Sequence, residues 1–227
     1  MPENHNDPAI KEAAALLGIP EDKMTPEILS RIAEQYQRIN EASAPKSIFA
    51  FFDIEVFGYG IFFDKTFPIR GRDLADICRE CKKAVLIAST LGSGIDMLLR
   101  RSQTEDMSDA VILDACASAE IERVTDLAES DIIKFLSPEE HLTMRFSPGY
   151  GDVPLEDSQK IISALSADRR IGLKLTGTDM LVPMKSVTAV IGISERITGR
   201  SKDCTSCSRR ESCAYKKRGG SCDIQNK

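Results

Sequence analysis

The chain contains, from Ser108 to Leu136, the stretch SDAVILDACASAEIERVTDLAESDIIKFL. Its apolar residues recur at intervals of three or four positions, which places their side chains on one face of an α-helix. These residues are Leu113, Ala117, Ile121, Val124, Ala128, Ile132 and Phe135. Ala115 and Ala119 are small enough to let another element approach closely. The pattern predicts one long amphipathic helix that ends before Pro138.

Strands and further helices are predicted on both sides of this helix. Residues 8–43 have helical spacing, and residues 47–65 predict two strands joined tightly around Tyr59. The run Ile48–Phe52 is apolar on both faces, so we expect it to be covered on both sides. Further helices are predicted at 72–82, around 97–101 and at 155–165, and further extended segments at 84–89, 172–175 and 186–193. This alternation indicates a mixed layer of strands and helices.

The composition bounds the class of protein. The chain has 227 residues, of which 42% are hydrophobic, and this is enough for one sizeable core. There is no apolar run of about 18 residues, and Met1–Asp7 is polar. We therefore expect a cytoplasmic protein that has no membrane partner.

The charge is distributed unevenly along the chain. From Gly199 onward there are eight Lys and Arg against three Asp and Glu, a formal charge of +5. Since the whole chain carries −5, residues 1–198 carry −10. We expect a body at 1–198, with its helical N-terminal part at about 8–43, and a basic Cys-rich tail at 199–227. Such a tail can bind nucleic acid or an acidic partner, or can simply be a solvated terminus, and we do not favour nucleic acid.

The tail contains Cys204, Cys207, Cys213 and Cys222. A CxxC pair followed by two more cysteines is typical of a metal site, holding either zinc or an iron–sulfur cluster. The alternative is a tail of free thiols. Cys78 and Cys81 stand three apart on a predicted helix and are interpreted as small core residues, as is Cys116.

A shaped loop follows the long helix, in the stretch RFSPGYGDVPLEDSQ from Arg145 to Gln159. Pro148, Gly149 and Pro154 restrict the backbone or permit unusual angles, so this loop can hold Arg145 and Tyr150 in fixed positions. An arginine suits bidentate capture of a carboxylate, and a tyrosine ring suits a flat or cationic group. After a helix comes IGLKLTGTDMLVPMKSV, Ile171 to Val187.

These two segments resemble the reactivation domain of vitamin B12-dependent methionine synthase. The first matches the family's arginine followed by Pro-Gly-Tyr and a nearby proline. The second matches through Gly172, Leu175, Thr176, Met180, Pro183, Ser186 and Val187. With the pattern above, this leads us to expect an α+β fold: a mixed, largely antiparallel twisted sheet packed with helices, including the long one at about 108–136, plus the small Cys-rich tail.

The resemblance also implies roles for individual residues. In the family, the loop arginine holds the carboxylate of S-adenosylmethionine and the Pro-Gly-Tyr turn approaches the nucleoside, which implies binding roles for Arg145, Pro148, Gly149 and Tyr150. Two family glutamates near the ligand correspond to Glu122 and Glu139. The family's adjacent tyrosines are missing, because this chain has Gly192, Ile193, Ser194 and Glu195 at that place.

The function implied is reactivation of an oxidised corrinoid. The chain would bind S-adenosylmethionine and act on cobalamin held by a separate methionine synthase or related corrinoid protein, with a low-potential electron donor. No catalytic side chain is expected, since the cofactors carry the chemistry, and only His5 and His141 are present. Without methyltransferase modules the chain would not make methionine alone. The alternatives are a corrinoid reductase that uses a tail cluster, and a noncatalytic module that binds a partner or nucleic acid.

Overall fold

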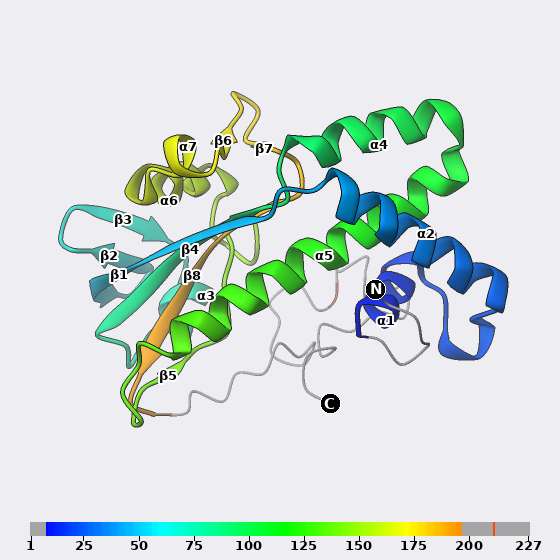
Figure 1. Ribbon diagram of the computed structural model, residues 1–227. Coiled ribbons are helices and arrows are strands. Elements are labelled where there is room, and N and C mark those ends of the chain that lie inside the picture. The colour runs from blue at the N-terminus through cyan, green and yellow to red at the C-terminus, as the bar shows by residue number, and fades with distance from the viewer. Residues whose placement is uncertain (1–7, 197–210, 212–227) are drawn as a thin grey trace.

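The computed structural model describes residues 8–196 and Glu211. In this part of the chain, an antiparallel sheet of six strands has the order β3-β2-β1-β4-β8-β5. The long helix α5 crosses one face of this sheet, and α3 and α6 pack on the other (Figure 1). The expected α+β fold with a largely antiparallel sheet and one long helix is confirmed.

The helices are α1 (Pro8–Leu17), α2 (Pro26–Ala42), α3 (Arg72–Ile77), α4 (Ser93–Glu105), α5 (Met107–Ile133), α6 (Ser158–Leu165) and α7 (Ala167–Arg170), with short 3₁₀ helices at Glu21–Lys23 and Leu155–Asp157. The strands are β1 (Lys46–Phe57), β2 (Gly60–Phe63), β3 (Phe67–Arg70), β4 (Lys83–Thr90), β5 (His141–Leu142) and β8 (Ser186–Ser194). A separate small hairpin pairs β6 (Lys174–Leu175) with β7 (Leu181–Val182).

Helix α5 contacts two different layers along its length. Its first part packs against α1, α2 and α4, with Leu113 and Cys116 buried among their apolar side chains. Its last part lies on the sheet, where Ala128 and Ile132 contact residues of β4 and β8. Asp106 caps the helix, because its carboxylate accepts hydrogen bonds from the backbone N–H groups of Ser108 and Asp109.

The predicted apolar stripe is confirmed as far as Ile132, and Ala115 and Ala119 are also buried. The prediction was wrong for Phe135, which is 68% exposed. The helix ends at Ile133, and tighter turn hydrogen bonds follow it, including one from the Phe135 N–H to the Ile132 carbonyl. The change of backbone path turns Phe135 toward the edges of the Phe49 and Phe51 rings.

Strand β1 is apolar on both faces, yet the two faces are covered unequally. Phe52 packs against Phe63 and Phe67 in the larger core. Phe51 on the opposite face is 41% exposed, so the expected coverage on both sides is wrong at this position. The sequence interpretation also missed β3, which contains Pro68; a proline is tolerated there because β3 is an edge strand.

Among the described residues, no helix is both long enough and apolar enough to cross a lipid bilayer.

We expect Gly94→Ala to lower the free energy of unfolding by about 1 to 3 kcal/mol, the usual cost of overpacking. An added Cβ at Gly94 would lie 2.1 Å from the Ala42 carbonyl oxygen, which belongs to backbone where α2 meets α4. The matched control is Gly177→Ala, because a Cβ there meets nothing within 4 Å. Urea denaturation measures the free energy of unfolding of both variants. Equal values would show that α2 and α4 can move apart at Gly94 without loss of stability.

Candidate functional site

The segment that carries Arg145 runs beside β8. The Thr143 N–H donates to the Gly192 carbonyl at 2.9 Å, and Phe146 exchanges two backbone hydrogen bonds with Val190. Phe146 points into the larger core, with only 8% of its surface exposed. Since neighbouring side chains of an extended segment point to opposite sides, Arg145 points instead toward α5.

Arg145 is paired with three carboxylates of α5. Its Nη2 donates to Glu122 Oε2 at 2.5 Å, its Nη1 donates to Asp126 Oδ1 at 2.9 Å, and Nη1 also donates to Glu129. The arginine side chain is only 4% exposed, whereas those of Glu122 and Asp126 are 37% and 44% exposed. We call Glu122, Asp126 and Glu129 the carboxylate cluster. It surrounds one buried cation and presents its acidic groups to solvent.

The carboxylate cluster keeps Arg145 charged. Burial lowers the pKa of the guanidinium, but the charges of Glu129, Glu122 and Asp126 outweigh burial and raise the pKa above its ordinary value. Because its pKa is higher in the folded protein than in the unfolded chain, the guanidinium stays protonated wherever the protein is folded. Its charge therefore contributes stability at every pH below the pKa of arginine in the unfolded chain. Formally, Arg145 and the three members of the carboxylate cluster together carry two negative charges.

The turn after Arg145 is fixed by backbone hydrogen bonds and by α3. The Gly149 N–H donates to the Val153 carbonyl at 2.9 Å, and Gly149 has a φ of +91°, which favours glycine. Asp152 then accepts hydrogen bonds from the N–H groups of Arg72 and Asp73 at the start of α3. The loop is therefore held at both of its ends, by β8 and by α3.

The residues implied by the resemblance lie in different surroundings. Glu122 contacts Arg145 directly. Pro148 is buried, whereas Gly149 is exposed and the Tyr150 side chain lies at the surface, 68% exposed. Glu139 lies in the exposed turn between α5 and β5, and it is not one of the carboxylates that pair with Arg145.

Asp126 and Glu129 were not predicted as site residues. The signal for them was present in the sequence, since Glu122, Asp126 and Glu129 follow one another at spacings of four and three. This spacing puts three carboxylates on one face of a helix, where like charges repel unless a cation lies among them. The sequence alone did not show that Arg145 is that cation.

No protein-family model matches the chain, and no curated protein matches it. The described structure does match solved structures, among them the crystal structure of the MetH reactivation domain bound to AdoHcy, with a TM-score of 0.55. The fold of this chain is similar to that of the MetH reactivation domain. The match covers 74% of this chain and 69% of the other at 16% sequence identity, so it concerns the fold.

The expected resemblance to a MetH reactivation domain is thus confirmed at the level of the fold. The positions at which the resemblance led us to look for adjacent tyrosines lie in β8, where Gly192, Ile193 and Ser194 are buried. This strand therefore contributes to the core at that place.

The cysteines predicted to bind metal, Cys204, Cys207, Cys213 and Cys222, lie outside the described residues, as does the boundary at 198. Their role and that boundary stay predictions. Within residues 8–196 and at 211, no group of three or more His, Cys, Asp or Glu side chains is arranged to hold a metal ion. Cys78, Cys81 and Cys116 are buried, as expected for core residues.

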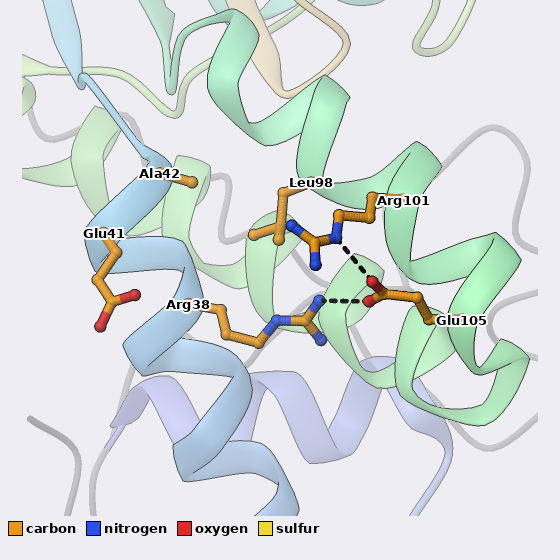
Figure 2. A pocket seen from close by; sticks show the side chains of 6 residues that line it. All are labelled: Arg38, Glu41, Ala42, Leu98, Arg101 and Glu105. Atoms are coloured by element: carbon orange, nitrogen blue, oxygen red, sulfur yellow. Dashed lines mark hydrogen bonds and ion pairs between the residues drawn. The ribbon is translucent and has the colours of Figure 1, made fainter.

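A hollow of about 470 Å³ lies apart from the predicted site residues, between α2 and α4 (Figure 2). Arg38 of α2 and Arg101 of α4 both point toward Glu105 of α4, with N–O distances of 3.7 and 2.7 Å (Figure 2). Glu105 balances one of the two arginine charges, and Glu41 also lines the hollow. Nothing about this hollow favours a particular ligand.

Replacement of Arg145 by alanine should lower the free energy of unfolding by about 2 to 4 kcal/mol, because the carboxylate cluster would lose the buried cation that it shares while staying partly desolvated. Arg79→Ala is the matched control: the Arg79 side chain is 74% exposed, and its ion pair with Asp76 should be worth less than about 1 kcal/mol. Chemical denaturation at neutral pH compares the two. A cost for Arg145→Ala no larger than that for Arg79→Ala would mean that the cluster does not stabilise the fold.

Proposed function

We propose that this protein binds S-adenosylmethionine where the Arg145 loop (residues 144–154) meets α5, and that it serves the reductive methylation of cobalamin held by a separate methionine synthase. One observation carries the proposal: the chain shares its fold with a reactivation domain whose crystal structure holds AdoHcy. The motif residues agree with it, since Arg145 and Glu122, 23 positions apart in the chain, are hydrogen-bonded.

The charge of the site suits this ligand. S-adenosylmethionine carries a sulfonium and an ammonium group, and both favour nearby carboxylates in a partly desolvated place. Glu122 and Asp126 are partly exposed and can reach a bound molecule, whereas Arg145 is buried behind them. We place the two cationic groups of the ligand against Glu122 and Asp126.

The carboxylate of the ligand would then lie near Arg145. A guanidinium has five N–H donors, so Arg145 can hold the ligand carboxylate if one of its present ion pairs rearranges. The exposed ring of Tyr150 and the Gly149 turn lie next along the loop and offer a flat surface and close backbone approach for the nucleoside. Glu139, in its exposed turn, remains a candidate for the margin of the site.

In titration calorimetry we expect saturable binding of S-adenosylmethionine, weakened by about 1.5 to 3 kcal/mol in Arg145→Ala, the usual worth of a hydrogen bond to a charged group. Arg145→Lys should recover only part of this, because a lysine lacks the planar fork. Glu122→Gln should also weaken binding, and it is the cleaner variant because Arg145 keeps its hydrogen bonds to Asp126 and Glu129 when the charge of the partly exposed Glu122 is removed.

Glu139→Gln is the matched comparison for Glu122→Gln, and a loss of affinity there would add Glu139 to the site. Circular dichroism of each variant checks that it is folded at the temperature of titration. If the folded Arg145→Ala and Glu122→Gln proteins bind as well as the original, the ligand does not use the Arg145 loop.

The proposed reaction needs two inputs. Cobalt(II) cobalamin becomes methylated when it gains one electron and receives a methyl group as a cation equivalent, and S-adenosylmethionine supplies the methyl group. This chain would hold the methyl donor in a fixed orientation over the corrinoid of its partner. The contact must be transient because a permanent complex would block turnover, so a small and partly polar interface is expected.

We expect the protein to restore turnover to a cobalt(II)-inactivated methionine synthase that lacks its own reactivation domain. Restoration should require both S-adenosylmethionine and a low-potential electron donor, since either alone leaves the cobalt unmethylated. Anaerobic absorption spectroscopy follows the conversion of the cobalt(II) spectrum to that of methylcobalamin. Conversion that is equally fast without the protein, or with Glu122→Gln when that variant binds no ligand, would contradict this function.

A further inference from the structure

We propose that Cys78 and Cys81 form a redox-active dithiol, which exchanges with small disulfides and closes to an intramolecular disulfide. Both are free cysteines, and they stand in the sequence Cys-Arg-Glu-Cys at the C-terminal end of α3. The inference is independent of S-adenosylmethionine binding, because it rests on the geometry of this turn.

The backbone holds the two cysteines at the separation that a disulfide needs. The Cys81 N–H donates to the Cys78 carbonyl at 2.8 Å, which closes a four-residue turn. In such turns the first and last Cα atoms lie within about 7 Å, and disulfides usually join Cα atoms about 4.4 to 6.8 Å apart. The turn can therefore accept the bond without a large movement of the backbone.

The two sulfur atoms also lie against the same backbone position of β8. A Cβ added to Gly192 would be 2.7 Å from Cys81 Sγ and 3.0 Å from Cys78 Sγ. Both thiols thus point to one small space above a glycine, where a side chain would separate or displace them. A pair of unrelated core cysteines would not need to converge on one point.

The pKa values of the two thiols are shifted in opposite directions, as in a dithiol in which one cysteine is the nucleophile. The hydrogen bond that Cys78 gives to Cys81 lowers the pKa of Cys81, although burial and the charge of Glu80 oppose this. The same hydrogen bond, together with burial, raises the pKa of Cys78. Cys116 has no such partner, and burial raises its pKa to about 12. Cys81 is also the more accessible of the two, with 5% of its surface exposed against none for Cys78. We therefore assign Cys81 as the thiol that attacks and Cys78 as the one that resolves.

The reaction balances with a small disulfide such as oxidised glutathione. The Cys81 thiolate attacks one sulfur of the glutathione disulfide, forms a mixed disulfide and releases one glutathione. Cys78 then attacks Cys81 Sγ, forms the Cys78–Cys81 bond and releases the second glutathione. The two thiol protons of the protein end on the two released molecules, and the two electrons reduce the disulfide.

Access to the pair is through the turn itself. Arg79 and Glu80, between the two cysteines, are exposed, and Cys81 keeps 5% of its surface accessible while Cys78 keeps none. Glu80 pairs with Arg196 at 3.3 Å, beside the point where the described chain ends. The sequence beyond holds four more cysteines, so the experiment must separate exchange within the turn from exchange with them.

The test exposes the full-length folded protein to glutathione buffers of increasing oxidised fraction, quenches with acid, and alkylates the free thiols after unfolding. Trypsin cuts after Arg79, so a Cys78–Cys81 disulfide leaves two tryptic peptides joined, which mass spectrometry detects. We expect the joined peptides and a loss of two alkylated thiols in the original protein and in a variant with Cys204, Cys207, Cys213 and Cys222 all changed to Ser. Cys116 should stay alkylated throughout.

Two single variants test the assigned roles. Cys78→Ser should accumulate a glutathione adduct on Cys81, whereas Cys81→Ser should form little adduct on Cys78. Circular dichroism in the same buffers shows whether the protein stays folded. The proposal is overturned if Cys78 and Cys81 remain as fully alkylated as Cys116 at every buffer, if they oxidise only where the fold is lost, or if oxidised Cys78–Cys81 requires the four tail cysteines.

Discussion

The burial of α5 on two sides is the constraint on which the rest of the structure depends. The first part of this helix supplies Leu113, Cys116 and Ala117 to the packing with α1, α2 and α4. Its last part supplies Ala128 and Ile132 to the sheet. Full burial of a large apolar side chain stabilises a fold by about 1.5 to 3 kcal/mol, so the helix cannot shift along its axis without losing contacts in both layers. One rigid element therefore joins the helical layer to the sheet.

The position of α5 also determines the geometry of the candidate site. Once the apolar stripe of α5 is fixed on the sheet, the neighbouring face bearing Glu122, Asp126 and Glu129 must lie toward the edge of the sheet beyond β8. The hydrogen bonds of Thr143 and Phe146 to β8 bring Arg145 to the same edge. A buried ion pair of this kind is weak evidence for stability, but it sets the relative position of a loop and a helix. It also leaves the partly exposed carboxylates of Glu122 and Asp126 at the place where we put a cationic ligand.

The two proposed sites lie on opposite faces of one short stretch of β8. Thr143, two residues before Arg145, hydrogen-bonds to both backbone groups of Gly192. A Cβ added to Gly192 would lie within 3.0 Å of the sulfur atoms of both Cys78 and Cys81. The glycine is needed because any side chain would enter the space filled by the two sulfurs and by Thr143. This part of β8 is thus filled by close packing of Thr143 and the two cysteines.

The sequence by itself determined the elements that have a local cause. The spacing of apolar residues predicted α5, a short apolar run predicted β4, the alternation of residues 186–193 predicted β8, and the proline and glycine positions predicted the Arg145 loop. Two predictions failed because burial depends on contacts with residues far away in the chain. Phe135 follows the apolar periodicity of α5 but lies past the end of the helix and is exposed. Phe51 is apolar, yet no other element covers its side chain completely. Only the tertiary structure decided that Arg145 pairs with three carboxylates of α5 and that two cysteines converge on Gly192. The physical reason is that the periodicity of a segment shows only which of its own side chains share a face. Which residues of another element that face contacts depends on how the elements pack together in the folded chain.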